Sequence, residues 1–286
     1  MSNNNSATVA VTGANPPSPD TEDPRTIADE TGDVLAADVS KYMLMSSQIA
    51  DDGSSESGLT KTIASELDLV HNLYLRTFDD QLGTAPPNEP NSKVGRVLDV
   101  GTGSGIWAID FGDEHPEADV VGIDLSASQP SFNLSPGGYL ELNDVDGFPT
   151  SDDGTLTDDC NLMKAFRLCF EALAALGSPF EEFSRFEGIM SEIGFEDVHI
   201  RRFKWPTNSW PKDQRHKELG IWNHENLAPH LEGLLMAPLT RALDWTREEV
   251  SLLAMEARKD LADRSIHAYF NIWSIHGRKP LKIEES

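Results

Sequence analysis

The stretch VLDVGTGSGIW, residues 97–107, decides how the middle of this chain folds. It ends a short run of buried-type residues, 94–100, and continues into a turn with glycine at every second position: Gly101, Gly103 and Gly105. Glycine permits a tight turn and lets a ligand approach the backbone without a Cβ atom in the way. The sequence therefore predicts a strand followed by a glycine-rich turn that faces a ligand.

The residues after the turn extend this unit. We expect a helix over 104–116, which Pro116 ends, and a second buried strand over 118–124. Strand, helix and strand in this order form a right-handed βαβ unit, the start of a doubly wound α/β sheet. The N–H groups at the start of the helix then point at the ligand and favour a carboxylate or phosphate there.

The spacing of the glycines distinguishes two classes of cofactor. A dinucleotide site has the form G-x-G-x-x-G, but Ile106 stands where its last glycine would be. The form G-x-G-x-G, preceded by an acid such as Asp99, is instead typical of S-adenosylmethionine (SAM) sites. Asp99 can hold the cationic amino-acid end of SAM. Asp124, at the end of the second strand, can accept hydrogen bonds from both ribose hydroxyls.

A purely structural role is the alternative for these residues. The glycines would then only pack a strand–helix turn, and Asp124 would cap a loop. A lone glycine run would favour that interpretation. Here two acids, three spaced glycines and a helix together favour a cofactor site. The predicted cofactor-binding residues are Asp99, Gly101, Gly103, Gly105 and Asp124.

Composition narrows the class of protein. The chain has 286 residues, enough for one substantial core with an appended lobe, and a net charge of −25. So acidic a protein is not expected to bind DNA or RNA directly, because the phosphates require basic partners. We see no apolar run of membrane-spanning length and no secretion signal. Cys160 and Cys169 fit reduced thiols, so a cytoplasmic or nuclear location is expected.

The first 57 residues differ from the rest of the chain. They are rich in Ser, Asn and Pro and hold ten acidic side chains against two basic ones, so we predict a disordered acidic region over 1–57. Only KYMLM at 41–45 is apolar enough to dock. A helix over 66–83 and a linker over 85–93 then lead to the glycine-rich unit.

The rest of the chain continues the same predicted domain, 58–280, and ends in a tail, 281–286. Strands are expected over 137–145, 195–206 and 265–280, helices over 158–176 and 179–193, and a helical lobe over about 207–264. Thr246 and Glu249 have the spacing of a capping box at the start of the last helix of this lobe.

The order of motifs strongly resembles the fungal LaeA-like class I methyltransferases, whose members include regulators of secondary metabolism. The motifs are RVLDVGTGSGIWAIDFGDEHPEADVVGIDLSASQPS (96–131), GGYLEL (137–142), SDDGTL (151–156), GFEDVHIRRFKWPTNSWPKD (194–213), ELG (218–220) and DRSIHAYFNIWSIHGRKP (263–280). The resemblance covers about residues 66–131 and 136–280.

This resemblance implies an α/β, Rossmann-like class I methyltransferase fold with a final antiparallel strand, and SAM as cofactor. It assigns the motif from Asp99 to Gly105 to the cofactor and Asp124 to its ribose, and it places the helix 66–83 over the cofactor. It also implies transfer of a methyl group to an acceptor, either a small fungal metabolite or a protein, linked to secondary metabolism.

The chain departs from the family between Asp124 and Gly138. Relatives carry several dozen residues there, which hold strands three and four of the sheet. The thirteen residues that remain here can reach about 40 Å when extended but leave no room for a covering helix. We therefore expect a reduced sheet, poorly covered on one face near strand 94–100.

Two explanations of the departure stay open. Either the segment is missing from this sequence through a skipped exon or a gene-model error, or strand 137–145 lies directly beside strand 94–100 in a smaller sheet. Both leave the adenine pocket and the acceptor wall incomplete. An active methyltransferase is the favoured hypothesis; the alternative is a catalytically inactive scaffold with a regulatory protein partner.

No catalytic residue follows from the sequence. Methyl transfer depends on alignment of the acceptor, and it needs a general base only where the acceptor loses a proton. Four histidines are candidate bases, although a structural role is favoured for each: His71, His224, His230 and His267. They have no acid or cysteine at metal-ligand spacing, so no metal site is expected. Four tryptophans could line an acceptor pocket or simply pack the lobe: Trp205, Trp210, Trp222 and Trp245.

Overall fold

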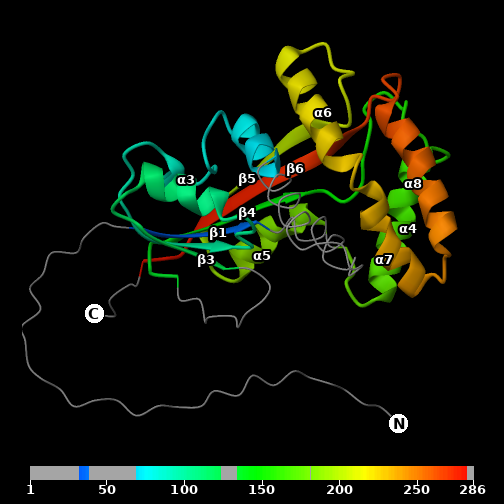
Figure 1. The fold of residues 1–286 in the computed structure, drawn as a ribbon. Helices are drawn as coiled ribbons and strands as arrows, with labels where there is room; N and C mark the ends of the chain where they lie inside the picture. The colour runs from blue at the N-terminus through cyan, green and yellow to red at the C-terminus, as the bar shows by residue number, and fades with distance from the viewer. Residues whose placement is uncertain (1–31, 39–68, 124–133, 181, 282–286) are drawn as a thin grey trace, which may run out of the picture. The chain divides into compact units, whose positions relative to one another are not determined.

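The computed structural model of the chain divides into two units, Met1–Glu30 and Thr31–Ser286. All residues whose structure is described belong to the second unit, and for 32–38 the description is of the backbone. The described residues are 32–38, 69–123, 134–180 and 182–281 (Figure 1).

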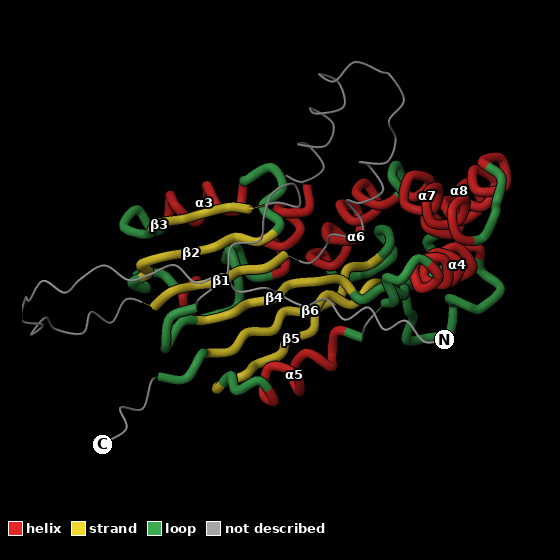
Figure 2. Tube along the Cα trace, turned by 90° about the horizontal axis from the view of Figure 1, so that it is seen from below, coloured by secondary structure: helices red, strands yellow, loops and turns green. Residues whose placement is uncertain are grey.

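A six-stranded mixed sheet lies at the centre of the described residues, in the order β3-β2-β1-β4-β6-β5 (Figure 2). The first four strands in this order are parallel, and β6 is antiparallel to both of its neighbours. The α/β fold with a reduced sheet and a final antiparallel strand is therefore confirmed. The strands are β1 (Gly32–Asp38), β2 (Val94–Val100), β3 (Asp119–Ile123), β4 (Tyr139–Val145), β5 (Glu196–Pro206) and β6 (Tyr269–Arg278).

Strand β1 corrects two expectations. It belongs to the region 1–57, for which composition predicts disorder, and that prediction is wrong for Gly32–Asp38. It also lies between β2 and β4, so the hypothesis that strand 137–145 directly adjoins strand 94–100 is wrong. The physical reason is that pairing with two neighbours overrides a weak local strand preference. The rest of 1–57 lies outside the described residues, and the domain boundaries stay a prediction.

One face of the sheet is covered by the helical residues 69–77 and by α3 (Ile106–Glu114). His71 of the first helix lies 2.8 Å from Asp110 of the second, so both helices lie on the same side. Each connects two adjacent parallel strands, β1 to β2 and β2 to β3, so the two crossovers have the same hand, as the rule for such units requires. Strand β1 thus fits the winding of the sheet.

The opposite face is covered unevenly. There α5 (Phe186–Glu192) packs over β4, β5 and β6, and Figure 1 shows it on the other side of the sheet from α3. Near β2 and β3 the described residues provide no such cover: Val121 is 49% exposed, whereas Val97, on the α3 side, is 3% exposed. Leu98, which pairs with Val121, is half-buried. The described residues therefore show the poorly covered face that the short junction predicts.

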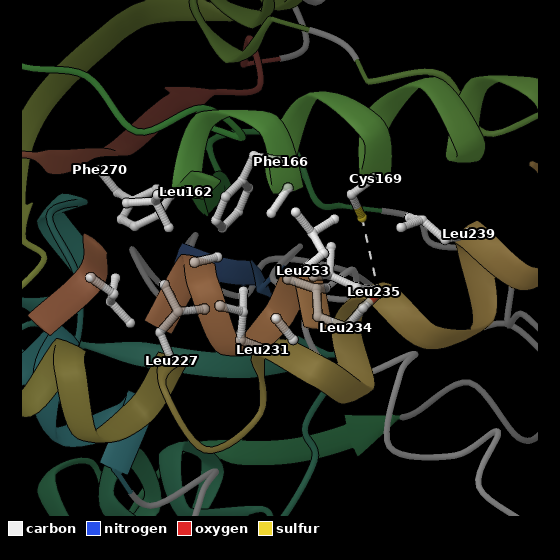
Figure 3. Close-up of a cluster of buried hydrophobic side chains, with 14 of the residues drawn as sticks. Leu162, Phe166, Cys169, Leu227, Leu231, Leu234, Leu235, Leu239, Leu253 and Phe270 are labelled. Atoms are coloured by element: carbon white, nitrogen blue, oxygen red, sulfur yellow. Dashed lines mark hydrogen bonds between the residues drawn. The ribbon is translucent and has the colours of Figure 1, made fainter. Parts of the chain in front are cut away.

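The helical lobe has the largest apolar core of the described residues. It holds α6 (Gln214–Leu227), α7 (Leu231–Ala242) and α8 (Arg247–Ala262) within the predicted range, and α4 (Asn161–Ala175) joins them from outside that range. Leucines of α7 and α8 face Phe166 and Cys169 of α4 (Figure 3). Burial raises the pKa of the Cys169 thiol to about 12, so it is a packing residue; both cysteines are free, as expected.

Several helix boundaries differ from expectation. Helix α4 begins at Asn161 rather than at 158, and the helix expected over 179–193 is the shorter α5, preceded by a turn of 3-10 helix over Phe183–Arg185. The ring of Phe180 packs against Phe148 and Phe170, which ties this stretch to the neighbouring helix and delays the start of α5. Tertiary contacts here override the local signals of a serine and a proline.

The capping box predicted at the start of α8 is present. The Thr246 hydroxyl accepts from the Glu249 N–H at 3.3 Å, and the Glu249 carboxylate accepts from the Thr246 N–H at 2.8 Å. We expect Thr246→Ala to lower the free energy of unfolding by about 1 kcal/mol, as measured by urea denaturation. Thr240→Ala, which removes a mid-helix hydroxyl bonded to the Met236 carbonyl, is the control and should change it by less than about 0.5 kcal/mol. Equal losses would contradict the capping role.

Candidate cofactor site

The glycine-rich turn has the backbone that its sequence predicts. Gly101, Gly103 and Gly105 have φ angles of +88°, +52° and +80°, in the left-handed region that L side chains rarely adopt. The Gly105 N–H donates to the Thr102 carbonyl at 2.7 Å and closes the turn. Helix α3 begins at Ile106, two residues after the expected start, because the left-handed Gly105 is its N-cap.

Asp99 and Thr102 are two polar side chains of this turn. Asp99, the penultimate residue of β2, is 4% exposed and lies level with Gly122 of β3. The Thr102 hydroxyl is buried and has no hydrogen-bond partner among the described residues. A Cβ atom on Gly122 would lie 2.5 Å from this hydroxyl oxygen, so only glycine fits there. Sequence analysis missed Thr102 and Gly122, although Gly122 stands in a strand, where glycine often marks a close approach.

The residues at the turn fit SAM. Three left-handed glycines leave the backbone open to a ligand, Asp99 supplies a carboxylate for an ammonium group, and Thr102 holds a buried hydroxyl that can still donate. Asp124, the predicted ribose acid, lies outside the described residues; β3 ends at Ile123, immediately before it. The ribose contact therefore stays a prediction.

The helical residues 69–77 and the turn that follows them are attached to the cofactor unit. His71 hydrogen-bonds Asp110 of α3, and the Trp107 indole N–H donates to the Leu82 carbonyl at 2.8 Å. Leu82 also packs with Phe111 in the core below α3. This helix thus lies against α3, whose first residue follows the glycine-rich turn; the resemblance places it over the cofactor, which stays a prediction.

A buried carboxylate, Glu141 of β4, fixes the next turn of the chain. Glu141 is 1% exposed and accepts hydrogen bonds from the backbone N–H groups of Thr84 at 2.6 Å and Ala85 at 3.0 Å. The Asn88 amide and the Ser274 hydroxyl donate to it at 3.0 and 3.2 Å. Burial raises the pKa of Glu141, although the hydrogen bonds act in the opposite direction. Glu141 therefore joins the turn at 84–88 to the sheet.

Sequence analysis missed Glu141. The available signal was an acid at the centre of the otherwise buried-type strand GGYLEL. Glu141 is also level with Ala36 of β1, which is in turn level with Asp99 of β2. The two carboxylate residues thus stand in one row across the sheet, with β1 between them.

His276 of β6 is a second polar residue that sequence analysis missed. It pairs directly with Glu141 across the antiparallel strands, and its Nδ1 lies 3.3 Å from the Thr84 hydroxyl. Burial lowers the pKa of His276 to about 4, and the nearby His199 and Arg201 add to the shift. The imidazole is therefore neutral at physiological pH.

The four candidate histidine bases differ in their contacts. His71 bonds Asp110, and His267 lies 2.5 Å from Asp153 and packs against the Trp210 ring. His224 lies 3.9 Å from Glu225, and His230 is the N-cap residue of α7. The contacts of His71 and His267 agree with the structural roles that the sequence favours for these two residues.

The tryptophans pack the lobe rather than forming one group. Trp205 is 4% exposed and its indole N–H donates to the Thr77 hydroxyl at 2.6 Å, while Trp222 and Trp245 pack against the same core. In the part of the chain that the structure describes, no three metal-ligating side chains come together, and no helix has the length and apolar character needed to cross a membrane.

Comparison with known proteins places the chain in a family, although no family model matches it. It is 32% identical to methyltransferase pytC of Aspergillus terreus, over 75% of this chain and 80% of that protein. It is 30% identical to the secondary metabolism regulator LAE1 of Cochliobolus heterostrophus, over 75% and 86%. It is 25% identical to the protein-methionine methyltransferase laeA of Emericella nidulans, over 76% and 70%.

Among solved structures, the [4+2]-cyclase SpnF aligns with a TM-score of 0.31 and 11% identity, over 90% of this chain and 78% of that one. A score of this size does not bear on the family. The sequence identities do, since they extend over most of both chains. The chain belongs to the LaeA-like family of fungal methyltransferases.

Proposed function

We propose that this protein is a SAM-dependent methyltransferase linked to secondary metabolism. The observation that carries the proposal is the glycine-rich turn, with three left-handed glycines directly after β2, whose penultimate residue is the buried Asp99. That turn stands in a chain whose relatives are named methyltransferases and secondary metabolism regulators.

Each residue of the turn has a distinct task in this proposal. SAM, when bound, supplies a methyl group on a sulfonium. Asp99 accepts hydrogen bonds from the ammonium end of the cofactor, and Asp124 accepts them from the ribose. The N–H groups at the start of α3 favour the cofactor carboxylate, and Thr102 can donate a further hydrogen bond. The glycines keep this backbone free of side chains.

The acceptor is either a small metabolite or a protein. The relative in Emericella nidulans is named for methylation of protein methionine. A thioether sulfur loses no proton when it is methylated, so a protein with this acceptor needs no general base. His71 and His267 are hydrogen-bonded to Asp110 and Asp153, which agrees with an acceptor that needs no base. A hydroxyl or amine acceptor would instead require a base.

Isothermal titration of the full chain with SAM tests the proposal directly. We expect binding heat at one site, and competition by S-adenosylhomocysteine, because that product keeps the amino-acid and ribose groups. Asp124→Ala should weaken the binding. A chain that gives no heat and no competition would refute the cofactor assignment.

A matched pair of glycine variants separates the turn from general backbone strain. Gly105 and Gly177 have φ angles of +80° and +85°, and a Cβ atom meets nothing closer than 4.0 Å at either position. Alanine should therefore cost each about 1 kcal/mol of stability through strain. Only Gly105→Ala should also weaken SAM binding, by about tenfold, because it displaces the cofactor-facing turn. Equal affinities of the two variants would contradict the site.

A catalytically inactive scaffold is the second candidate function. The observation that favours it is the exposed apolar side chain of Val121 on the thinly covered face beside β2 and β3. A regulatory partner that co-purifies with the chain, and still does so in the Asp99→Ala and Gly103→Ala variants, would support it. A chain without such a partner that turns over SAM would exclude it.

A further inference from the structure

Strand β5 forms one edge of the described sheet and has β6 on one side only (Figure 2). After a bulge at its start, residues His199–Pro206 pair with β6 in unbroken register. In an antiparallel ladder, alternate residues point their N–H and C=O groups toward the partner, so the others point away from it. Those of β5 meet no further strand in the part of the chain that the structure describes. Such an edge can accept another strand.

The helical lobe covers only the carboxyl end of this edge. There the Asn223 amide of α6 donates to the Trp205 and Pro206 carbonyls at 3.5 and 3.0 Å. The residues before them, His199–Lys204, extend over about 20 Å, and we call this stretch the basic edge. At the other edge of the sheet, β3 has five residues against eleven in β5, so it offers a shorter template.

The basic edge carries the opposite charge to the chain as a whole. It holds Arg201, Arg202 and Lys204 and no acid, in a chain with 23 basic and 48 acidic side chains. The Lys204 ammonium lies 2.6 Å from Asp152, but neither arginine forms an ion pair with a described residue, and both are exposed. Charges more than about 8 Å away are largely screened at physiological ionic strength. The two guanidinium groups therefore determine the local charge preference of this edge.

Aromatic rings hold both guanidinium groups in place. Arg201 lies over the ring of Phe203, 4.9 Å from its centroid, and Arg202 lies over the ring of Trp273 in β6, at 5.7 Å. Successive residues of a strand point to opposite faces of the sheet, so the two arginines flank the edge on its two faces. Side chains that are already ordered lose less entropy when they bind a carboxylate.

The order of side chains along the basic edge determines which segment fits it. Residues opposite the two arginines should be acidic, because opposite charges across a ladder attract and like charges repel. Residues opposite the half-buried Ile200 and Phe203 should be apolar. The fitting segment thus reads apolar, acidic, acidic, apolar, in either chain direction. A second copy of β5 in this register would place arginine opposite arginine.

We propose that the basic edge is a docking site for an extended acidic segment of a partner protein, which adds to the sheet beside β5. Main-chain hydrogen bonds hold the segment, and its two adjacent carboxylates, opposite Arg201 and Arg202, select it. Three strands separate β5 from β2 and the glycine-rich turn. The docking site is therefore independent of the proposed cofactor site.

NMR titration of the full chain with the capped hexapeptide Thr-Val-Glu-Glu-Val-Thr tests the proposal. The control peptide, Glu-Val-Thr-Thr-Val-Glu, has the same composition and charge, but its acids are not adjacent. We expect the first peptide to bind at least about tenfold more tightly than the control. It should also slow hydrogen exchange at alternate residues of the basic edge, because only the outward amides gain a partner. This period of two distinguishes an added strand from attraction between charges alone.

Three double variants test the role of the arginines. Arg201→Glu with Arg202→Glu should weaken binding of the first peptide at least about tenfold, because two attractive pairs become repulsive. Arg247→Glu with Arg264→Glu makes the same change in net charge at exposed positions outside the basic edge, and should bind as the wild type does. Arg201→Lys with Arg202→Lys keeps both charges and should bind within about threefold of the wild type. Urea unfolding of each variant checks that it is folded.

Three results would overturn the proposal. Equal affinities of the two peptides, or binding of neither, would show that the arginines only keep the edge from pairing with other chains. Slow exchange of the outward β5 amides in the chain without peptide would show that a segment of this chain already covers the edge. A dimer in light scattering that Arg201→Glu with Arg202→Glu dissociates would show that a second copy occupies it. If the charge reversal fails to fold, the comparison of the two peptides on the wild type still decides.

Discussion

The variant Glu141→Gln is expected to lose about 3 kcal/mol of folding free energy, because the buried carboxylate serves several donors at once. Its oxygens accept from the Thr84 and Ala85 N–H groups and from the Asn88 amide. A glutamine of the same shape keeps one acceptor oxygen and turns an NH₂ group toward the remaining donors. At least one buried N–H then has no acceptor, and two donors face each other.

Thermal and urea unfolding measure this loss. With about 2–4 °C per kcal/mol for a domain of this size, the melting temperature should fall by roughly 9 °C. Glu248→Gln, the same change at an exposed position of α8, is the control and should change stability by less than about 0.5 kcal/mol. Glu141→Leu should be at least as destabilising as Glu141→Gln, since it removes every acceptor. Similar stabilities of Glu141→Gln and Glu248→Gln would refute the role of Glu141.

The second large expected effect is on the free energy of unfolding, whose pH dependence includes a contribution from His276. Burial lowers the pKa of this imidazole from 6.5 to about 4. Between these two values the unfolded chain binds a proton at His276 that the folded chain does not bind. The stabilisation is therefore complete above pH 6.5 and is lost as the pH falls through about 4. Since one pKa unit corresponds to about 1.4 kcal/mol, the loss amounts to about 3 kcal/mol.

The comparison of wild type with His276→Gln isolates this contribution from that of the carboxylates. Both proteins lose stability in acid, but we expect the wild type to lose about 2–3 kcal/mol more than the variant between pH 6.5 and 4. Urea unfolding at half-unit pH steps gives the two curves. Parallel curves would show that His276 does not stay neutral in the folded chain.

Both residues act on the candidate site through the same turn. Glu141 and His276 hold Thr84 from adjacent strands, and the neighbouring Leu82 carbonyl accepts the hydrogen bond of Trp107 in α3. Since α3 starts at the glycine-rich turn, loosening of 82–88 is expected to reach the cofactor site as well as the stability of the fold. Hydrogen bonds thus connect strands β4 and β6 to this turn, and the turn to α3.

The local signals in the sequence located most elements of this protein. Gly101, Gly103 and Gly105 marked the turn because glycine adopts a left-handed backbone without the strain that an L side chain brings. The capping pair Thr246 and Glu249 marked the start of α8. These signals are short-range, so they can be read without knowledge of the rest of the chain.

The buried polar cluster of Thr84, Glu141, Ser274 and His276 could not be predicted from local signals. Glu141, Ser274 and His276 lie on two strands that are far apart in sequence, and Thr84 lies between the predicted helix 66–83 and the predicted linker 85–93. Glu141 was visible as an acid within strand 137–145, but its partners depend on which strands become neighbours. Long-range pairing decides that.

The sequence by itself determined the βαβ unit and its glycine-rich turn, because glycine spacing and strand alternation are properties of neighbouring residues. The family and the antiparallel end of the sheet followed from the resemblance that the order of motifs carries. Only the tertiary structure decided what stands between β2 and β4. The strand between them is Gly32–Asp38, and the composition of this segment does not favour a strand. A central strand obtains its stability from the two ladders beside it, and those ladders exist only after distant parts of the chain have come together.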